Sequence, residues 1–390
     1  MERGLFVADM LSPANEAELA DAVTEATATS TPLEIRGGGT RAGLGRPVQA
    51  EKTLSTSRLA GITLYEPGAL TLVVKAGTPL AEVEAALAVE GQMLPFEPMD
   101  HRAILGTSGE PTIGGVVACG VSGPRRIQAG ACRDATLGVR FVNGKGEVVK
   151  SGGRVMKNVT GYDLVKLMCG SFGTLGVLSE ISFKVLPKPE AEATLVCKGL
   201  SAATGVAALS AALGSPFGIT GAAHWDGNSL VRIEGLEGSV AYRGEQLQGR
   251  LGSGWEIVTG AASAALWREV RDVGPFAGCD GAIWRLSVKP ADGPVLSDAL
   301  RAEGLDHSAL FDWGGGLVWL LAGEDGDAGA SLIRHRIATM GGHATLVRAS
   351  AATRAAVDVF EPEPAPLAAI SAGLRAKFDP AGVLNPGRMG

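Results

Sequence analysis

Two glycine-rich segments constrain this chain more than any other feature of its sequence. The first, Ile35–Gly43, contains Arg36-Gly37-Gly38-Gly39-Thr40, and the second, Gly106–Pro124, contains Thr112-Ile113-Gly114-Gly115. Glycine reaches positive φ and lets a backbone come very close to a ligand. Consecutive N–H groups in such a turn form a concave site for a diphosphate. Tight turns without a ligand would use the same glycines, so the pattern leaves both interpretations open.

Neither segment is one of the common nucleotide-binding signatures. There is no Gly-Lys-Ser/Thr sequence as in a P-loop, and neither segment is a G-x-G-x-x-G fingerprint that opens a helix. The hydroxyls of Thr40, Ser108, Thr112 and Ser122 could serve as further hydrogen-bond donors to a phosphate, beside the backbone N–H groups. The common nucleotide folds therefore do not fit, although close backbone approach is demanded twice.

The overall composition narrows the class of protein. The chain has 390 residues, of which 46% are hydrophobic, and 35 Lys and Arg against 41 Asp and Glu give a net charge of −6. This composition is globular, and the length predicts two domains or three. The 56 glycines show no three-residue period, which excludes collagen. Only 5% of the residues are aromatic and no basic tract occurs, so nucleic-acid binding is not expected.

The cysteines and the N-terminal segment bear on metal binding and localisation. The five cysteines are scattered and form no C-x-x-C pair, which argues against a disulfide framework and a thiolate metal cluster. No histidine and carboxylate cluster has metal-ligand spacing, so we expect no metal. The chain opens without a long apolar signal region and has no run of 18 apolar residues, so we expect a cytoplasmic protein.

Local patterns predict a mixture of helices and strands. A helix is expected to start at Ser12-Pro13, and Asn143-Gly144 is expected to join a hairpin. Strands are predicted at Pro32–Ile35, Leu70–Lys75, Ala282–Val288 and Leu317–Leu321, with a half-buried strand through Ile181, Phe183 and Val185. A linker is expected at 187–189, a stiff connector at 361–366 and a last helix at 367–378. No internal repeat is visible.

A third segment gives the two glycine segments a common interpretation. Lys157-Asn158-Val159-Thr160-Gly161-Tyr162-Asp163-Leu164 is followed by Gly170-Ser171-Phe172-Gly173-Thr174-Leu175-Gly176-Val177-Leu178, and the chain closes on Phe378–Met389. In this order the motifs resemble the FAD-binding family of vanillyl-alcohol oxidase (PCMH) type, over about residues 1–187. Within it the chain is most similar to the FAD-binding E subunits of bacterial glycolate oxidases.

The resemblance implies a set of FAD-binding residues. In that family the first glycine segment and the Thr-Ile-Gly-Gly segment enclose the FAD pyrophosphate, and the tail returns to the flavin. Carried over, the cofactor-binding residues are Arg36, Gly37, Gly38, Gly39, Thr40, Thr112, Ile113, Gly114, Gly115, Ser122, Gly123, Asp134, Gly176, Val177 and Asn385. Some members link FAD to a histidine at the position of Thr40, which cannot form the bond. We therefore expect non-covalent FAD, and we expect Cys132 to be a packed residue rather than a link.

The substrate side departs from the related hydroxyacid dehydrogenases, which carry a G-E-H-G-I-G motif that is missing here. Oxidation of a 2-hydroxyacid needs a base for the hydroxyl proton and a cation for the carboxylate. Arg285 is the candidate cation, and His343 or His224 is the candidate base, although each is more often structural. Tyr162-Asp163 could orient groups near the flavin, or Asp163 could cap a helix.

The resemblance also implies the architecture and the partners. We expect an α+β fold with a two-subdomain FAD-binding domain at 1–187 (subdomains about 1–50 and 51–187), a smaller α+β cap at 190–350, and a segment at 351–390 that packs back on the flavin domain. The implied function is that of an FAD subunit in a complex that oxidises glycolate to glyoxylate, with a paralogous FAD subunit and an iron–sulfur subunit. The alternatives are a stand-alone FAD-dependent alcohol or hydroxyacid oxidoreductase, and a non-catalytic FAD-binding scaffold. Membrane contact, if any, would come through partners.

Overall fold

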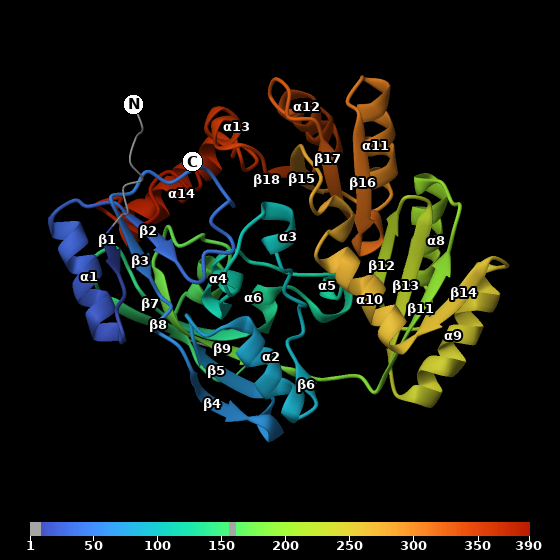
Figure 1. Ribbon diagram of the computed structural model, residues 1–390, viewed down its shortest axis with the longest axis horizontal. Helices are drawn as coiled ribbons and strands as arrows, with labels where there is room; N and C mark the ends of the chain where they lie inside the picture. Colours follow the sequence, from blue (N-terminus) through green and yellow to red (C-terminus); the bar gives the residue numbers. More distant parts are fainter. Residues whose placement is uncertain (1–8, 156–160) are drawn as a thin grey trace.

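The computed structural model describes residues 9–155 and 161–390 (Figure 1). Lys157–Thr160, the first half of the third motif, lies outside the described residues. The chain forms a small parallel sheet, a five-stranded antiparallel sheet and an eight-stranded antiparallel sheet, with helices packed against them. This is the predicted α+β fold.

The small parallel sheet opens the chain and holds the first glycine segment. Its strands, in the order β1-β3-β2, are β1 (Asp9–Leu11), β2 (Leu33–Arg36) and β3 (Lys52–Ser55). Helix α1 (Glu16–Ala28) buries Leu19, Val23 and Ala26, which recur at helical spacing. Its N-cap is Asn15, whose side chain accepts the Glu18 N–H, so the predicted start at Ser12 was wrong. This sheet also extends beyond the predicted subdomain boundary at about residue 50, because β3 is one of its strands.

The five-stranded sheet forms the centre of the N-terminal half. Its order is β4-β5-β9-β7-β8, with β4 (Ile62–Glu66), β5 (Thr71–Lys75), β7 (Thr136–Val142), β8 (Val148–Gly152) and β9 (Val177–Lys184). The predicted hairpin is present, since β7 pairs with β8 across the turn at Asn143. Strand β9 is the central strand, and Ile181 and Phe183 are fully buried while Lys184 is only partly buried, as the alternation predicted. Val177, at the start of the strand, packs with α1 in a separate cluster.

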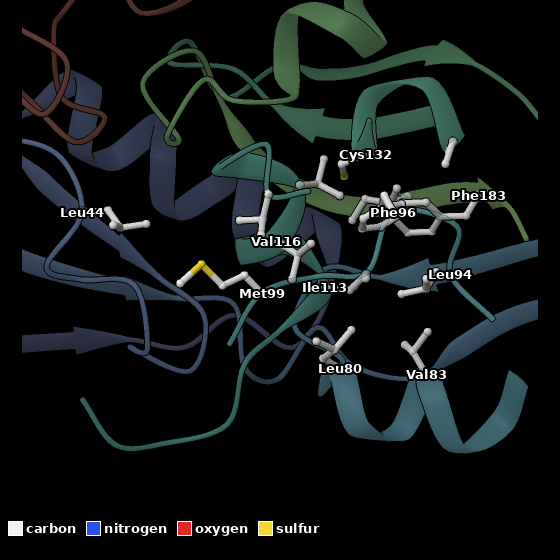
Figure 2. Close-up of a cluster of buried hydrophobic side chains, with 14 of the residues drawn as sticks. Leu44, Leu80, Val83, Leu94, Phe96, Met99, Ile113, Val116, Cys132 and Phe183 are labelled. Atoms are coloured by element: carbon white, nitrogen blue, oxygen red, sulfur yellow. The ribbon is translucent and has the colours of Figure 1, made fainter. Parts of the chain in front are cut away.

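Short helices and one small ribbon surround this sheet. The helices are α2 (Leu80–Val89), α3 (Arg102–Leu105), α4 (Ile113–Ala118), α5 (Arg126–Ala129), α6 (Cys132–Ala135) and α7 (Leu164–Met168), with a 3-10 turn η1 (Pro67–Ala69). Strand β6 (Gln92–Met93) pairs with β10 (Leu186–Pro187). Figure 2 shows side chains of α2 and α4, such as Val83 and Ile113, in the hydrophobic cluster beside Phe96.

The eight-stranded sheet begins just after the predicted linker. Its order is β14-β11-β13-β12-β16-β17-β15-β18, with β11 (Ala191–Cys197), β12 (Ile219–Trp225), β13 (Asn228–Gly235), β14 (Trp255–Thr259), β15 (Ala282–Ser287), β16 (His307–Asp312), β17 (Leu317–Ala322) and β18 (His343–Arg348). Its helices are α8 (Ala202–Leu213), α9 (Glu237–Leu251), α10 (Gly260–Arg271), α11 (Asp292–Ala302) and α12 (Ala330–Met340), with the 3-10 turns η2 (Gly274–Phe276) and η3 (Trp313–Gly315).

This sheet contains an internal repeat that the sequence analysis missed. Strands and helices β11-α8-β12-β13-α9-β14 form one βαββαβ unit, and β15-α11-β16-β17-α12-β18 form a second. The two units join through antiparallel pairing of β12 with β16, at His224 opposite Phe311. Only the topology is repeated, and a one-sequence search for matching residues cannot detect that.

The C-terminal segment returns to the N-terminal part of the chain up to residue 187, where the FAD-binding domain is expected and which is called the flavin half below. This return was predicted. After α13 (Ala351–Ala356) and α14 (Ala365–Phe378), the chain lies beside β2 (Figure 1). Leu33 and Leu384 form a parallel bridge, and the Leu33 N–H donates to the Val383 carbonyl at 2.8 Å. The largest hydrophobic cluster contains Phe183 of the five-stranded sheet and Trp319 of the eight-stranded sheet, so the two sheets share a core.

Candidate functional site

The first glycine segment packs its backbone directly against the second. A Cβ atom on Gly38 would overlap the carbonyl oxygen of Glu110, and one on Gly37 would overlap the hydroxyl of Thr112. No side chain fits between backbones this close. Glycine is therefore required at these two positions by contact between the loops.

The second segment is held by the helix that it starts. Thr112 is the N-cap of α4, and its hydroxyl accepts the Gly115 N–H at 3.4 Å. Gly114 lies against β5, since its Cβ would be 2.7 Å from the carbonyl oxygen of Ala76. These contacts set the start of α4 beside the first segment.

Both segments line one narrow groove. Most of the predicted cofactor-binding residues lie along it: Arg36, Gly37, Gly38, Gly39, Thr40, Thr112, Gly114, Gly115, Gly176, Val177 and Asn385. Gly176 is required by space, because a Cβ would come 2.6 Å from the ring of Phe141. The groove thus unites motifs that lie far apart in the sequence.

Asn385 ties the C-terminal tail to this groove. Its Oδ1 accepts the Ile35 N–H at 2.8 Å, and its Nδ2 donates to the Phe172 carbonyl at 2.8 Å. Its own N–H donates to the carbonyl of Leu33 at 2.9 Å. One asparagine side chain therefore links the tail, β2 and the third glycine motif.

Two buried arginines in the groove escaped the sequence analysis. Arg41 and Arg388 are each 7% exposed, and in the described part of the chain the Nε of each is buried with no hydrogen-bond partner. Burial lowers the pKa of both guanidinium groups. A buried cation with an unpartnered N–H fits an anionic ligand, so the residues present fit the FAD pyrophosphate. Arg41 directly follows Thr40, so a positive charge next to the glycine motif was the sequence feature that could have indicated this residue.

The groove continues into a wider cavity of about 570 Å³, and Cys119 and Phe172 line both. Of the predicted residues, Ser122, Arg285 and His343 line the cavity. Their positions come from both halves of the chain, so the cavity lies between the flavin half and the eight-stranded sheet. Ligand sites commonly lie at such interfaces.

The two predicted catalytic residues lie on neighbouring strands. Arg285 of β15 is directly opposite Thr345 of β18, and Ser287 is opposite His343, so Arg285 and His343 are two register steps apart on paired strands. His343 is exposed at the start of β18, and partial desolvation of its ring, followed by the charge of Arg285, lowers its pKa. The imidazole is therefore neutral near pH 7 and able to accept a proton.

Three arginines and a second histidine line this cavity. Arg126, Arg133 and His101 line it together with Arg285. Burial, followed by repulsion from Arg126, lowers the pKa of Arg285 to about 10. Burial and the neighbouring Arg41 lower the pKa of His101 to about 3, so this ring is neutral. The arrangement can bind a carboxylate.

Several predicted residues lie outside the groove and the cavity. The Ile113 side chain is in the hydrophobic core, and the Asp134 carboxylate accepts the N–H of Ala131 at the start of α6. The Gly123 carbonyl accepts the indole N–H of Trp313. The sequence motif could not tell a side chain that lines the groove from one that supports it.

The remaining candidates have structural partners. His224 bonds to Ser229 at 2.8 Å and lines a different cavity, so it is not the base for a substrate at Arg285. Asp163 caps α7 by accepting the Lys166 N–H, and Tyr162 is 89% exposed. The structural interpretation of Asp163 is therefore correct.

Within residues 9–155 and 161–390, no group of three or more His, Cys, Asp or Glu side chains is arranged to hold a metal ion. In the same described ranges, no helix combines the length and apolar character needed to cross a bilayer.

The chain is similar to several known proteins. Residues 8–152 match the family described as FAD binding domain. The chain is 41% identical to glycolate oxidase subunit GlcE of Escherichia coli (strain K12) over 374 residues, which cover 95% of this chain and 96% of that protein. It is 30% identical to glycolate oxidase subunit GlcD of Bacillus subtilis (strain 168) over 188 residues, which cover 48% of this chain and 38% of GlcD.

Two further likenesses concern a dehydrogenase and the fold. A D-lactate dehydrogenase of Archaeoglobus fulgidus is 28% identical over 180 residues, which cover 46% of this chain and 39% of that protein. A solved structure of alkyldihydroxyacetonephosphate synthase superimposes with a TM-score of 0.69 at 17% identity, over 97% of this chain and 75% of that chain. At this identity the likeness concerns the fold alone.

Proposed function

Because this chain belongs to the family of the glycolate oxidase subunit GlcE, we propose that it is an FAD-binding subunit of a complex that oxidises glycolate to glyoxylate. The matched FAD binding domain and the hydroxyacid dehydrogenases among its relatives support FAD-dependent oxidation of a 2-hydroxyacid. The observation that carries the proposal is that the glycine groove is continuous with a cavity lined by Arg285 and His343.

The groove residues would hold the cofactor without a covalent link. Backbone N–H groups of both glycine segments would face the pyrophosphate, and Arg41 and Arg388 would offset its charge. Thr40 stands where a linking histidine would be required, so we propose non-covalent FAD. When bound, FAD would supply the acceptor for the hydride removed from the substrate.

The cavity residues would bind and orient the substrate. The Arg285 guanidinium would hold the carboxylate of the 2-hydroxyacid in two parallel hydrogen bonds. A ring nitrogen of His343 would accept the hydroxyl proton, since its lowered pKa leaves it neutral. Arg285 is partly buried between the two halves, which would strengthen its attraction for a carboxylate.

We also propose a division of labour within the chain and the complex. Residues 1–187 would bind FAD, 190–350 would form the cap, and 351–390 would close the flavin side. The subunit name of the GlcE relative supports a complex of several chains. The five cysteines of this chain are scattered, so a partner would supply any iron–sulfur centre, and a GlcD-like subunit would supply a second flavin.

An anaerobic visible spectrum before and after addition of glycolate tests the proposal. In the assembled complex, the flavin bands of this subunit are expected to bleach, and replacing Gly38 and Gly114 with bulky residues is expected to abolish glycolate-dependent dye reduction. Full retention of dye reduction in that variant would contradict the proposal. Bleaching in the isolated chain would favour a stand-alone oxidoreductase, and a bound flavin that is never reduced in the complex would favour a scaffold.

A further inference from the structure

Trp313 joins the two arginines of the cavity. The guanidinium carbon of Arg126 lies 4.3 Å from the centroid of the Trp313 ring, and that of Arg285 lies 5.3 Å from it. Arg126 comes from α5 in the flavin half, whereas Arg285 and Trp313 come from the eight-stranded sheet. One aromatic ring therefore holds two cations from opposite sides of the interface.

Neither guanidinium has an anionic partner in the part of the chain that the structure describes. Arg126 and Arg285 make no side-chain hydrogen bond and no ion pair there, although the nearby Arg125 and Arg232 are paired with carboxylates. Two like charges next to each other repel, as the effect of Arg126 on the pKa of Arg285 shows. An anion bound by both would relieve this repulsion and accept hydrogen bonds from their N–H groups, which have no side-chain partner among the described residues.

The backbone of Trp313 is held in a costly conformation. Its φ is +52°, in the left-handed region that residues with a side chain seldom adopt. The Asp312 carboxylate accepts its N–H at 2.7 Å, and its indole N–H donates to the Gly123 carbonyl at 3.1 Å. Strained backbone conformations persist only where the surrounding contacts hold them, and they cluster at functional sites. Trp313 is held in this way beside two arginines that line the cavity.

From these contacts we infer that Trp313 is a positioning residue, which holds Arg126 and Arg285 as a two-arginine clamp for one substrate carboxylate. The negative electrostatic potential of the indole ring face attracts both cations, and neither cation has a carboxylate partner among the described residues. The clamp forms only when α5 docks against the eight-stranded sheet. The inference rests on the proposed function, and it adds Arg126 and Trp313 to the residues that determine specificity for a 2-hydroxyacid.

The test is a binding titration of the purified, FAD-loaded chain with acetate. Acetate has the carboxylate of glycolate and no hydroxyl to oxidise, so changes in the visible flavin spectrum report its Kd without turnover. We expect Trp313→Leu and Arg126→Gln each to raise the acetate Kd about 10-fold or more, as loss of a charge-assisted contact does. Trp313→Phe keeps a ring face, and its Kd is expected to lie between those of the wild type and Trp313→Leu.

A double variant separates the clamp from general damage. Because ring and arginine act as one unit, Trp313→Leu with Arg126→Gln is expected to bind acetate no more weakly than the worse single variant. Arg268→Gln is the matched control: it removes one positive charge from the exposed face of α10, and Arg268 lines neither the groove nor the cavity. Its Kd is expected to change by less than about 3-fold because solvent screens the charge.

Three results would overturn the inference: an unchanged Kd in Trp313→Leu, effects of ring and arginine that multiply, or a shifted flavin potential with unchanged acetate binding. If Trp313→Leu does not fold or loses FAD, Trp313→Phe and Arg126→Lys supply the same comparison. Glycolate oxidation by a complex whose FAD-loaded chain binds no acetate would refute the clamp alone. Acetate binding as expected, without glycolate oxidation by the complex, would refute the proposed function and leave the clamp in place.

Discussion

Arg232 donates to both carboxylate oxygens of Glu97, at 2.8 Å to Oε1 and 2.9 Å to Oε2. Arg232 lies on β13 of the eight-stranded sheet, and Glu97 belongs to the flavin half. Glu234 and Arg125 form a second pair beside them. Burial acts to raise the pKa of Glu97, but Arg232 and Arg125 outweigh it and lower that pKa. The interface that builds the cavity is therefore held by buried charges.

Removing one member of this network is expected to destabilise the protein strongly. Glu97→Gln leaves Arg232 buried with an incomplete set of partners, and such losses cost about 3–5 kcal/mol of unfolding free energy. Denaturant unfolding measures the change. The control is Lys166→Ala, which breaks an ion pair whose side chains are 56% and 50% exposed and should cost less than about 1 kcal/mol. Equal effects of the two variants would contradict the role of the network.

Gly38→Ala is expected to abolish FAD binding. The added Cβ would overlap the Glu110 carbonyl oxygen, so the two glycine loops would have to separate and the groove between them would change shape. The measurement is the flavin content per chain after gel filtration. Gly68→Ala is the matched control, since Gly68 has open space around its Cα and is exposed. A Gly38→Ala chain with its full complement of FAD would refute the requirement.

Acid precipitation is expected to release all of the flavin into the supernatant. Thr40 stands at the position of the linking histidine and has no nitrogen to bond to the flavin ring. Cys132 is fully buried and lines neither the groove nor the wider cavity, so it is not placed to form the link. The absorbance of supernatant and pellet decides the matter. Yellow colour that stays with the precipitated protein would show a covalent bond.

Most of the residues predicted from the local motifs line the groove, for a physical reason. Gly38 and Gly114 lie against backbone carbonyl oxygens, and Gly37 lies against the Thr112 hydroxyl, so none of the three positions has room for a side chain. The requirement therefore appears in the sequence as short runs of glycine. Helix α1 shows the limit of local rules, because Ser12 and Asn15 are both good caps and only the hydrogen bond from Glu18 selects Asn15.

The rest of the site depends on contacts between distant segments. Arg126 and Trp313 meet because α5 docks on the corner between β16 and β17, and no spacing in the sequence encodes that contact. The two βαββαβ units likewise share a topology rather than a pattern of residues. Arg285 and His343 could be proposed as candidates from their chemistry, but their placement on paired strands needed the structure.

Arg285→Gln is expected to impair oxidation of glycolate by the assembled complex far more than it impairs folding. It removes a charged donor for the carboxylate, a contact whose loss lowers kcat/KM by about 10- to 150-fold. Arg285→Lys should recover only part of this, because an ammonium group cannot form two parallel hydrogen bonds. The exposed Arg268 on α10 supplies the control, and Arg268→Gln should leave kcat/KM unchanged. Equal kcat/KM in the wild type and Arg285→Gln would remove Arg285 from the site.

The last prediction concerns Asp312, the buried residue that holds the N–H of Trp313. Its side chain is 2% exposed, and burial raises its pKa from 3.8 to about 7. Between these two pH values the folded protein keeps a proton that the unfolded chain has lost, so ionisation of Asp312 lowers stability as the pH rises. Well below pH 3.8 both states are protonated and this cost is absent.

Asp312→Asn should therefore become progressively more stable than the wild type between pH 4 and pH 7. The amide oxygen can still accept the Trp313 N–H, while the ionisation is gone, and the gain can reach about 4 kcal/mol at pH 7. Urea unfolding of both proteins at half-unit pH steps measures the difference. Asp298→Asn, at an exposed position on α11, controls for the change of charge. Parallel stability profiles for the wild type and Asp312→Asn would show that Asp312 does not titrate in this range, and a carboxylate charged throughout would then stand beside the two arginines on Trp313.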